Sequence, residues 1–285
     1  MINMIGTLLR WGWRLLVGLV AAGLAWATFF LMFPYLDDHL PLFIVLAILY
    51  IWTAYVGIPL LVRLWHIVLR PNHLPHYVTS GDGWSSDPVN LAVVCRGRKE
   101  LIQAMTQAGW YMADEGSIRT NLRLAWAVVF HRSYPTAPFS RLYLFGRQQD
   151  IGFQIPVDGS PRHRHHIRFW LLRPDEPKKQ AHHHTFWQTI FKPFTRGKKQ
   201  IWIGAATHDI GPFALRVRTL QVTHKIDAKT DRERDFVLGS LNKATKRHEV
   251  IQAGEPLKFR GQTFGINIVT DGTLHVVELK RQTIQ

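Results

Sequence analysis

Residues 13–64 read WRLLVGLVAAGLAWATFFLMFPYLDDHLPLFIVLAILYIWTAYVGIPLLVRL and decide how the chain is organised. Two apolar runs, residues 13–36 and 42–64, are separated by the short stretch DDHLP. Each run is longer than the roughly 20 residues that a helix needs to cross a hydrocarbon core about 30 Å thick. Two such runs joined by so short a loop predict a pair of transmembrane helices that form a hairpin.

Basic residues border this hairpin on one side only. Arg10 and Arg14 lie at the start of the first run, Arg63 and Arg70 lie at the end of the second, and the loop carries no Lys or Arg. Basic residues collect on the cytoplasmic side of a membrane. The pattern therefore predicts a multi-pass protein with both termini in the cytoplasm.

The rest of the chain is strongly basic. The first 76 residues hold four of the 35 Lys and Arg and two of the 20 Asp and Glu, so 31 basic and 18 acidic residues remain, a net charge of +13. Such a surplus predicts a polyanionic partner. Membrane lipids explain it more simply than nucleic acid, because no recognised nucleic-acid module is present. The single cysteine, Cys95, excludes an intramolecular disulfide, and its place in the apolar run LAVVC predicts a packing residue.

We expect three parts: the hairpin over residues 1–76, a polar, Gly-rich linker over 77–88, and a domain over 89–285. Apolar spacing in the domain predicts helices near 98–110, 121–131 and 231–244. Strands are expected at 89–95, 142–146, 150–156, 164–172, 201–209 and 214–227, the last two separated by a Gly-Pro turn, and at 264–279 as a hairpin turning at Asp271-Gly272. Strand runs with scattered helices predict an α+β fold, a mixed or antiparallel sheet with flanking helices.

The stretch SPRHRHHIRFWLL, residues 160–172, alternates basic and apolar side chains. Arg162, Arg164, His166 and Arg168 fall on one face, and the apolar residues at 167 and 169 fall on the other. We therefore expect the basic row to face a cleft or solvent. Three roles stay open for it: a metal site, a phosphate site, or a strand beside an anionic surface.

Histidine and acidic residues on the neighbouring segments suggest chemistry. They are the ligands that Zn, Mn and Fe(II) prefer and the parts of a general acid–base site, so a divalent metal is the cofactor they suggest. The candidate catalytic residues are Asp209, His224, Asp227 and Glu233, and the candidate metal ligands are His166, Asp209, His224 and Asp227. In the structural alternative, Asp227 caps the following helix and Glu233 pairs with an arginine of the strand.

Arginines form a candidate anion site. Guanidinium groups match the geometry of phosphate. The set comprises Arg162, Arg164, Arg168, Arg216 and Arg218, which Arg147 could join. The alternative is a solvated polar sheet face whose arginines pair with acidic residues of the last helix.

A basic, aromatic insert occupies residues 174–199. Its apolar residues cover an arc of about 140° on a helix, with lysines and an arginine at the flanks. They are Phe186, Trp187, Ile190, Phe191 and Phe194. This pattern predicts an interfacial helix on an anionic membrane, and the alternative is an aromatic plug packed on the domain.

Several motifs in order resemble one known family. They are DPVNLAVV (87–94), AGWYMAD (108–114), LYLFGRQQDIGFQ (142–154), SPRHRHHIRFW (160–170), IWIGAATHDIG (201–211) and VTHKIDAKTDRERDF (222–236). From about residue 85 to 280 the chain resembles the LssY C-terminal-like domain family. The resemblance implies a bacterial membrane-associated protein, here of the inner membrane. It implies no activity, because the family has none established and this chain lacks the phosphatase motif of the lipid-phosphatase-type proteins to which relatives are fused.

We therefore expect a membrane-anchored accessory or binding module that engages anionic lipid or a phosphorylated ligand in bacterial envelope or lipid metabolism. Its partners would be membrane lipids, with a membrane protein as a further candidate. The alternative is a metal-dependent hydrolase acting on a phosphorylated or membrane-derived substrate. The residues leave open whether the chain is an enzyme.

Overall fold

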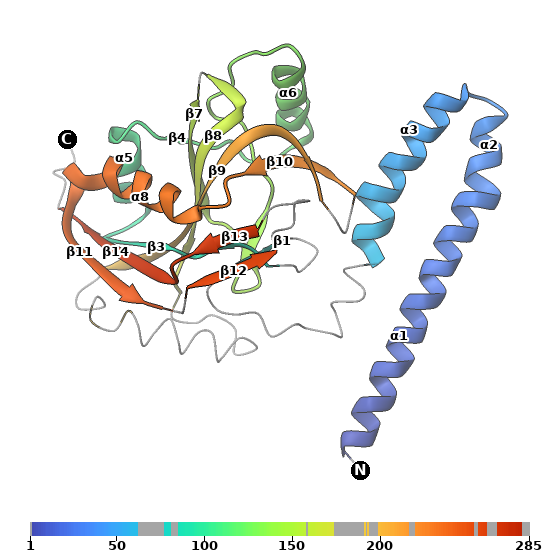
Figure 1. The fold of residues 1–285 in the computed structure, drawn as a ribbon, viewed down its shortest axis with the longest axis horizontal. Helices are drawn as coiled ribbons and strands as arrows, with labels where there is room; N and C mark the ends of the chain where they lie inside the picture. The colour runs from blue at the N-terminus through green and yellow to red at the C-terminus, as the bar shows by residue number, and fades with distance from the viewer. Residues whose placement is uncertain are drawn as a thin grey trace. The chain divides into compact units, whose positions relative to one another are not determined.

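A computed structural model describes residues 2–61, 77–80, 85–157, 159–173, 191, 193, 199–216, 220–253, 256–260 and 267–280 (Figure 1). Contacts divide the chain into two compact units. The first comprises Met1–His73, Gly81–Trp84 and Leu215–Gln221, and the second comprises Leu74–Ser80, Ser85–Ala214 and Val222–Gln285. The first is mainly helical and the second is built largely from strands.

The first unit is an apolar two-helix hairpin. Its first arm is α1 (Ile2–Ala27), the π-helical turn η1 (Thr28–Met32) and α2 (Phe33–Asp37), and its second is α3 (Leu42–Trp52) followed by the π-helical turn η2 (Thr53–Gly57). Trp52 Nε1 donates to Thr28 Oγ1 at 3.1 Å and links the arms. Residues Trp11–Asp37 and Leu42–Leu61 are long and apolar enough to cross a membrane. The apolar hairpin expected from residues 13–64 is therefore confirmed.

The second unit contains one large mixed sheet. Its order is β11 (Thr245–Gln252), β14 (Thr273–Leu279), β3 (Leu91–Cys95), β9 (Gln200–Leu215), β8 (Ser160–Leu171), β7 (Ile151–Val157) and β4 (Tyr111–Met112), and β10 (Val222–Ile226) also pairs with β9. Strands β14 and β3 run parallel, whereas β9 is antiparallel to both β3 and β8. The expected mixed sheet of an α+β domain is confirmed.

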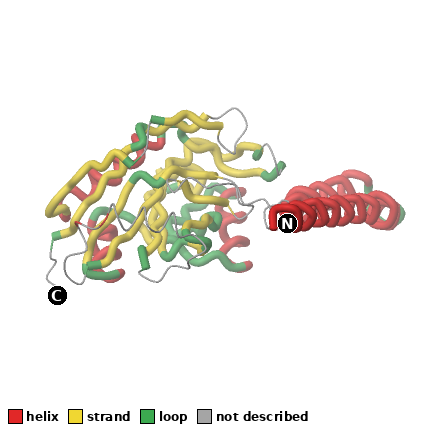
Figure 2. Tube along the Cα trace, turned by 90° about the horizontal axis from the view of Figure 1, so that it is seen from below, coloured by secondary structure: helices red, strands yellow, loops and turns green. Residues whose placement is uncertain are grey.

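Two smaller sheets and four helical segments complete the described part of this unit. One sheet has the order β2 (Ser85–Pro88), β1 (Tyr77–Ser80), β5 (Leu142–Leu144) and β6 (Arg147–Gln148), and the other pairs β12 (Leu257–Arg260) with β13 (Asn267–Thr270). The helices are α5 (Arg98–Gln107), α6 (Ile118–Val129), α8 (Thr230–Leu241) and the 3₁₀ turn η5 (Asn242–Ala244). Figure 2 shows strands making up most of the unit, with the helices at its periphery.

Apolar cores cover both faces of the large sheet. On one face, Leu101 and Met105 of α5 and Val237 and Leu241 of α8 pack against the strands. On the opposite face, residues of β1 and β5 in the four-stranded sheet pack against it. Because both faces are covered at the centre of the sheet, any polar side chain there on β8 or β9 must find a partner inside the protein.

Three expectations differ from the structure. Residues 77–88, expected as a linker, contribute β1 and β2. Gly211 and Pro212, expected to form a turn, lie inside strand β9. Proline has no backbone N–H to donate, but Pro212 lies beyond Asp209, the last residue of β9 that pairs with β8, so no hydrogen bond to β8 is lost. The turn at Gly272, with φ of +74°, connects two different sheets, because β13 pairs with β12 while β14 pairs with β11 and β3.

Candidate functional site on strands β8 and β9

Strands β8 and β9 carry polar residues on both faces at the same level of the sheet. Their pairing places Arg164 opposite Asp209 and His165 opposite His208. Successive side chains of a strand point to opposite faces. The first pair therefore faces the four-stranded sheet, and the second faces α8.

The Arg164 side chain binds partners inside the protein. Its Nε donates to Asp209 Oδ2 at 3.0 Å, and its Nη1 donates to Gln154 Oε1 at 2.9 Å. The other carboxylate oxygen of Asp209 lies 3.2 Å from His166 Nε2. All four side chains are buried. Burial lowers the pKa of His166, against the opposing effect of Asp209, so the ring is neutral at pH 7.

A second buried ion pair lies along the same row. Arg168 Nη1 donates to Asp87 Oδ2 at 3.3 Å, and Thr207 Oγ1 donates to the same oxygen at 3.4 Å. The Phe139 ring lies over the guanidinium groups of Arg168 and Arg164, at 4.5 and 5.6 Å from its centroid. Two arginines and two aspartates thus neutralise one another beneath an aromatic ring.

The described members of the basic row do not face a cleft or solvent, which corrects the expectation. Arg164, His166 and Arg168 are each less than 5% exposed. The cause is the layer of residues 77–80, 85–88 and 139–145, which covers this face of the sheet and supplies Asp87. A buried guanidinium needs a carboxylate partner, so the row here forms internal ion pairs.

The opposite face holds a compact cluster of His165, His208 and Glu233. His165 Nδ1 lies 2.7 Å from Glu233 Oε2. The His165 ring is stacked between those of His208 and Phe236, at centroid distances of 4.2 and 4.0 Å. One candidate ligand atom from each of His165, His208 and Glu233 lies within 4.8 Å of the others.

Burial shapes the protonation of this cluster. It raises the pKa of Glu233, although the hydrogen bond with His165 opposes the shift. It lowers the pKa of His208, and the neighbouring His165 adds to that effect. Glu233 Oε1 is buried and has no hydrogen-bond partner among the described residues. The cluster therefore offers neutral imidazole and a carboxylate oxygen whose bonding capacity is unused.

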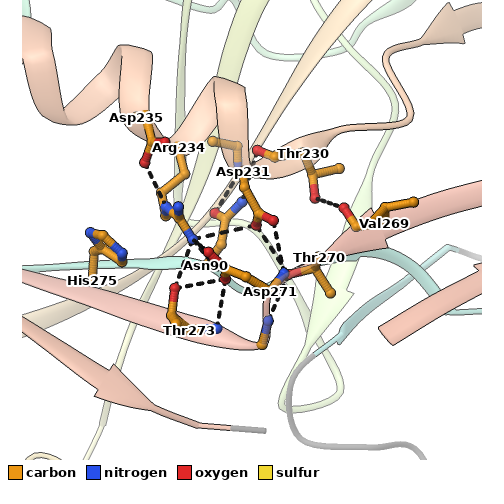
Figure 3. A network of polar contacts seen from close by, with 12 residues as sticks. Asn90, Thr230, Asp231, Arg234, Asp235, Val269, Thr270, Asp271, Thr273 and His275 are labelled. Carbon is orange, nitrogen blue, oxygen red and sulfur yellow. Dashed lines mark hydrogen bonds and ion pairs between the residues drawn. The ribbon is translucent and has the colours of Figure 1, made fainter. Parts of the chain in front are cut away.

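A polar network fixes the start of α8 and so positions Glu233. Arg234 Nη1 donates to Asp271 at 2.9 Å and to Thr273 Oγ1 at 2.8 Å, and its Nε donates to Asp235 at 2.9 Å (Figure 3). Asp231 accepts from the Asp271 backbone N–H at 2.8 Å. These contacts join the first turn of α8 to the segment between β13 and β14.

The remaining candidate residues are dispersed. Asp227 accepts from the Lys229 backbone N–H and shapes the turn before α8, but it does not cap the helix as the structural alternative proposed, because Lys229 is the N-cap residue. Among the described residues, Glu233 pairs with His165 and not with an arginine. Arg216 belongs to the first unit, where its backbone carbonyl accepts from the Leu220 N–H at 3.0 Å. The side chains of Arg162 and His224, and all of Arg218, lie outside the described residues.

The insert is described only in part. Phe186, Trp187, Ile190 and Phe194 lie outside the described residues. Phe191 is fully buried in the core beside the four-stranded sheet. This residue therefore packs on the domain, as the plug alternative requires, and does not lie at a membrane interface.

Sequence reasoning missed Asp87, Gln154 and His208. Asp87 lay in the presumed linker, and Gln154 lay inside a short, mostly apolar strand without a local signal. His208 was detectable in principle, because it alternates with Thr207 and Asp209 and must share the face of His165 once the strands pair.

The same segments carry the family assignment. The family model described as LssY C-terminus matches residues 71–274. The chain belongs to the LssY C-terminus family. No curated protein and no solved structure matches the chain. The LssY C-terminus match covers β8, β9 and α8, and therefore both clusters described above, but it assigns them no activity.

Proposed function

We propose that this LssY C-terminus protein is a membrane-anchored accessory module that docks on the anionic surface of a bacterial inner membrane. Both termini would lie in the cytoplasm, which the arginines flanking the hairpin support. The observation that carries the proposal is the exposed apolar face of α6. A reporter fused after residue 285 tests the orientation, and a periplasmic signal would contradict it.

Helix α6 exposes large apolar side chains at helical spacing. Its exposed residues are Ile118, Leu122, Trp126, Val129 and the following Phe130, with exposed fractions from 51% to 82%. Positions i, i+4, i+8 and i+11 share one face of a helix. The opposite face is occupied, because Leu124 and Ala127 pack with Tyr134 and Ala137. The helix is therefore amphipathic, with its larger apolar residues turned outward.

Charge identifies the surface that would cover this face. Residues 117–133 contain Arg119, Arg123, His131 and Arg132 and no acidic residue. All four side chains are exposed. Apolar and aromatic residues bordered by arginines are typical of helices that lie in the interface of an anionic bilayer. Because the apolar hairpin would hold the domain at a bilayer, the local concentration of this surface is high.

Site-directed labelling of the full chain in lipid nanodiscs tests the docking. Cys95 is buried and its pKa is raised to about 12, mainly by burial, so it will not compete for a thiol reagent. A nitroxide on Val129→Cys should be shielded from a water-soluble relaxation agent in discs with anionic lipid. A nitroxide on Val250→Cys, which replaces an exposed apolar residue of β11, is the control and should stay accessible. Equal accessibility at both positions would contradict docking.

A second candidate function is metal-dependent hydrolysis at the cluster of His165, His208 and Glu233. Imidazole and carboxylate are suitable ligands for Zn, Mn or Fe(II). Glu233 Oε1, which has no hydrogen-bond partner among the described residues, could serve as the carboxylate ligand. The two rings are stacked within 14° of parallel, so one ring must turn before both nitrogens can face one ion. When bound, the metal would supply Lewis-acid activation of water or a phosphoryl oxygen.

Metal analysis of the full chain tests this candidate. The protein is purified without a histidine tag and with His182, His183 and His184 replaced, because those three could bind metal adventitiously. About one equivalent of metal, lost in His208→Ala and retained in His163→Ala, would support the site. Equal metal content in the two variants, or none in the parent, would exclude it.

A further inference from the structure

A basic pocket lies where the two parallel strands of the large sheet end. Strand β3 ends at Cys95 and β14 at Leu279, and their pairing brings these ends together. The pocket has a volume of about 370 Å³. Its charged lining residues are Arg96, Glu100, Lys199, Lys246, Glu278 and Lys280. In sheets with parallel strands, the carboxyl ends of those strands are a frequent place for ligands.

Cations outnumber anions around this pocket by four to two. Glu278 Oε1 accepts from both Lys199 Nζ, at 3.0 Å, and Lys246 Nζ, at 3.4 Å. One carboxylate therefore serves two ammonium groups, and each retains donors for a further acceptor. Lys280 Nζ donates to the Lys243 carbonyl oxygen. That acceptor is uncharged, so the contact does not neutralise the positive charge of Lys280.

Helix α5 adds a second source of positive potential. It begins at Arg98, with Arg96 and Gly97 between it and β3, and Glu100 of its first turn lines the pocket and accepts from the Arg96 backbone N–H at 2.5 Å. The first backbone N–H groups of a helix lack partners within the helix and carry partial positive charge. A strand followed at once by a helix at the end of a parallel pair is a favourable place for phosphate.

We propose that this pocket binds a phosphate monoester, with the phosphate beside Lys199, Lys246 and the first turn of α5. The lining residues of the pocket carry a surplus of two positive charges, which the two negative charges of a phosphate monoester would balance. A ligand with one carboxylate would balance only half of that surplus. The volume accommodates the phosphate and a small attached group. This site is separate from α6, so its failure would leave membrane docking untouched.

Titration of the full chain in nanodiscs with glycerol 3-phosphate tests the pocket. Binding is measured by broadening of the ³¹P resonance and by the rise in melting temperature. We expect the double variant Lys199→Gln with Lys246→Gln to weaken binding at least tenfold. Lys225→Gln, which changes an exposed lysine of β10 outside the lining, should leave it unchanged. No binding to the parent chain, or equal binding by the double variant, would overturn the proposal.

Two further measurements complete the test: a milder variant and a competition with lipid. The single variant Lys246→Gln alters a side chain that is 65% exposed, so it retains the fold if the double variant does not, and it should weaken binding several-fold. Discs that contain phosphatidic acid distinguish the source of the monoester. Displacement of glycerol 3-phosphate by that lipid would identify a lipid headgroup, and undiminished binding would identify a soluble ligand.

Discussion

Arg164 Nε and Asp209 Oδ2 lie 3.0 Å apart, and both side chains are buried. The two residues face each other across adjacent strands, and 45 positions of sequence separate them. Their ion pair neutralises the Arg164 guanidinium, which would otherwise be a buried charge without a partner. A row that looks like an anion-binding surface in the sequence is therefore part of the interior.

Asp209→Ala should destabilise the domain strongly. It would leave the Arg164 guanidinium buried without its carboxylate, and breaking such a pair costs about 3–5 kcal/mol. The free energy of unfolding, measured by denaturant titration of the full chain in detergent, checks this. Asp235→Ala removes a carboxylate that is 60% exposed and should cost less than about 1 kcal/mol. Similar losses in both variants would contradict the assignment of Arg164 to the core.

Gly152→Ala should destabilise the domain because Phe139 lies against this position. A Cβ at residue 152 would lie 2.2 Å from Phe139 Cζ. Moving the ring off the arginines should cost about 1–3 kcal/mol. Gly239→Ala is the matched control: it lies in α8 with no atom near its Cβ, and should stabilise by about 0.5–1 kcal/mol. Thermal unfolding of both variants in parallel measures the contrast, and a neutral Gly152→Ala would show that Phe139 is not fixed there.

His275 should make stability fall as the pH is lowered. Burial, with the charges of Arg234 and His248, lowers its pKa from 6.5 to about 4. Between these values the unfolded chain binds a proton that the folded protein does not, so stability is complete above pH 6.5 and lost toward pH 4. The shift corresponds to at most about 3 kcal/mol, reduced by partial exposure.

The variant His275→Gln isolates this effect. The difference in unfolding free energy between parent and variant, measured from pH 7.5 to 4, should change in favour of the variant as the pH falls. A difference that stays constant with pH would show that His275 titrates equally in both states.

Arg119→Gln with Arg132→Gln should weaken docking of α6. Each basic residue near an anionic surface contributes about 1 kcal/mol to binding, so the double variant should weaken the free energy of docking by about 2 kcal/mol. Relaxation of the nitroxide at position 129 in anionic discs measures this. Arg232→Gln on α8 is the exposed control. If raising the salt concentration affected the parent and the double variant identically, the arginines would have no role in docking.

Several elements follow from local sequence because their signal is periodic. The hairpin is set by two apolar runs of membrane length, α5 by helical spacing that ends at Gly109 with φ of +89°, and β8 by strict alternation. Helix α6 is capped by Ser117, whose side chain accepts from the Thr120 backbone N–H in a capping box. In each case residues of the same continuous segment supply the physical cause.

The pairing of those elements has no such local signal. Residues 77–88 read as a linker, yet the described parts of this stretch, 77–80 and 85–88, cover the basic row and bring Asp87 to Arg168 across 81 positions of sequence. The turn at Asp271-Gly272 is visible in the sequence, but the sheets that it joins are not.

The sequence by itself determined the apolar hairpin, the family and the alternation of β8, because each depends on residue types at short, fixed spacing. Only the tertiary structure decided that Arg164 and Arg168 are interior ion pairs, that His165 meets His208 and Glu233, and that lysines gather at the ends of β3 and β14. The physical reason is burial. Whether a charged side chain binds a ligand or an internal partner depends on which distant segments cover it.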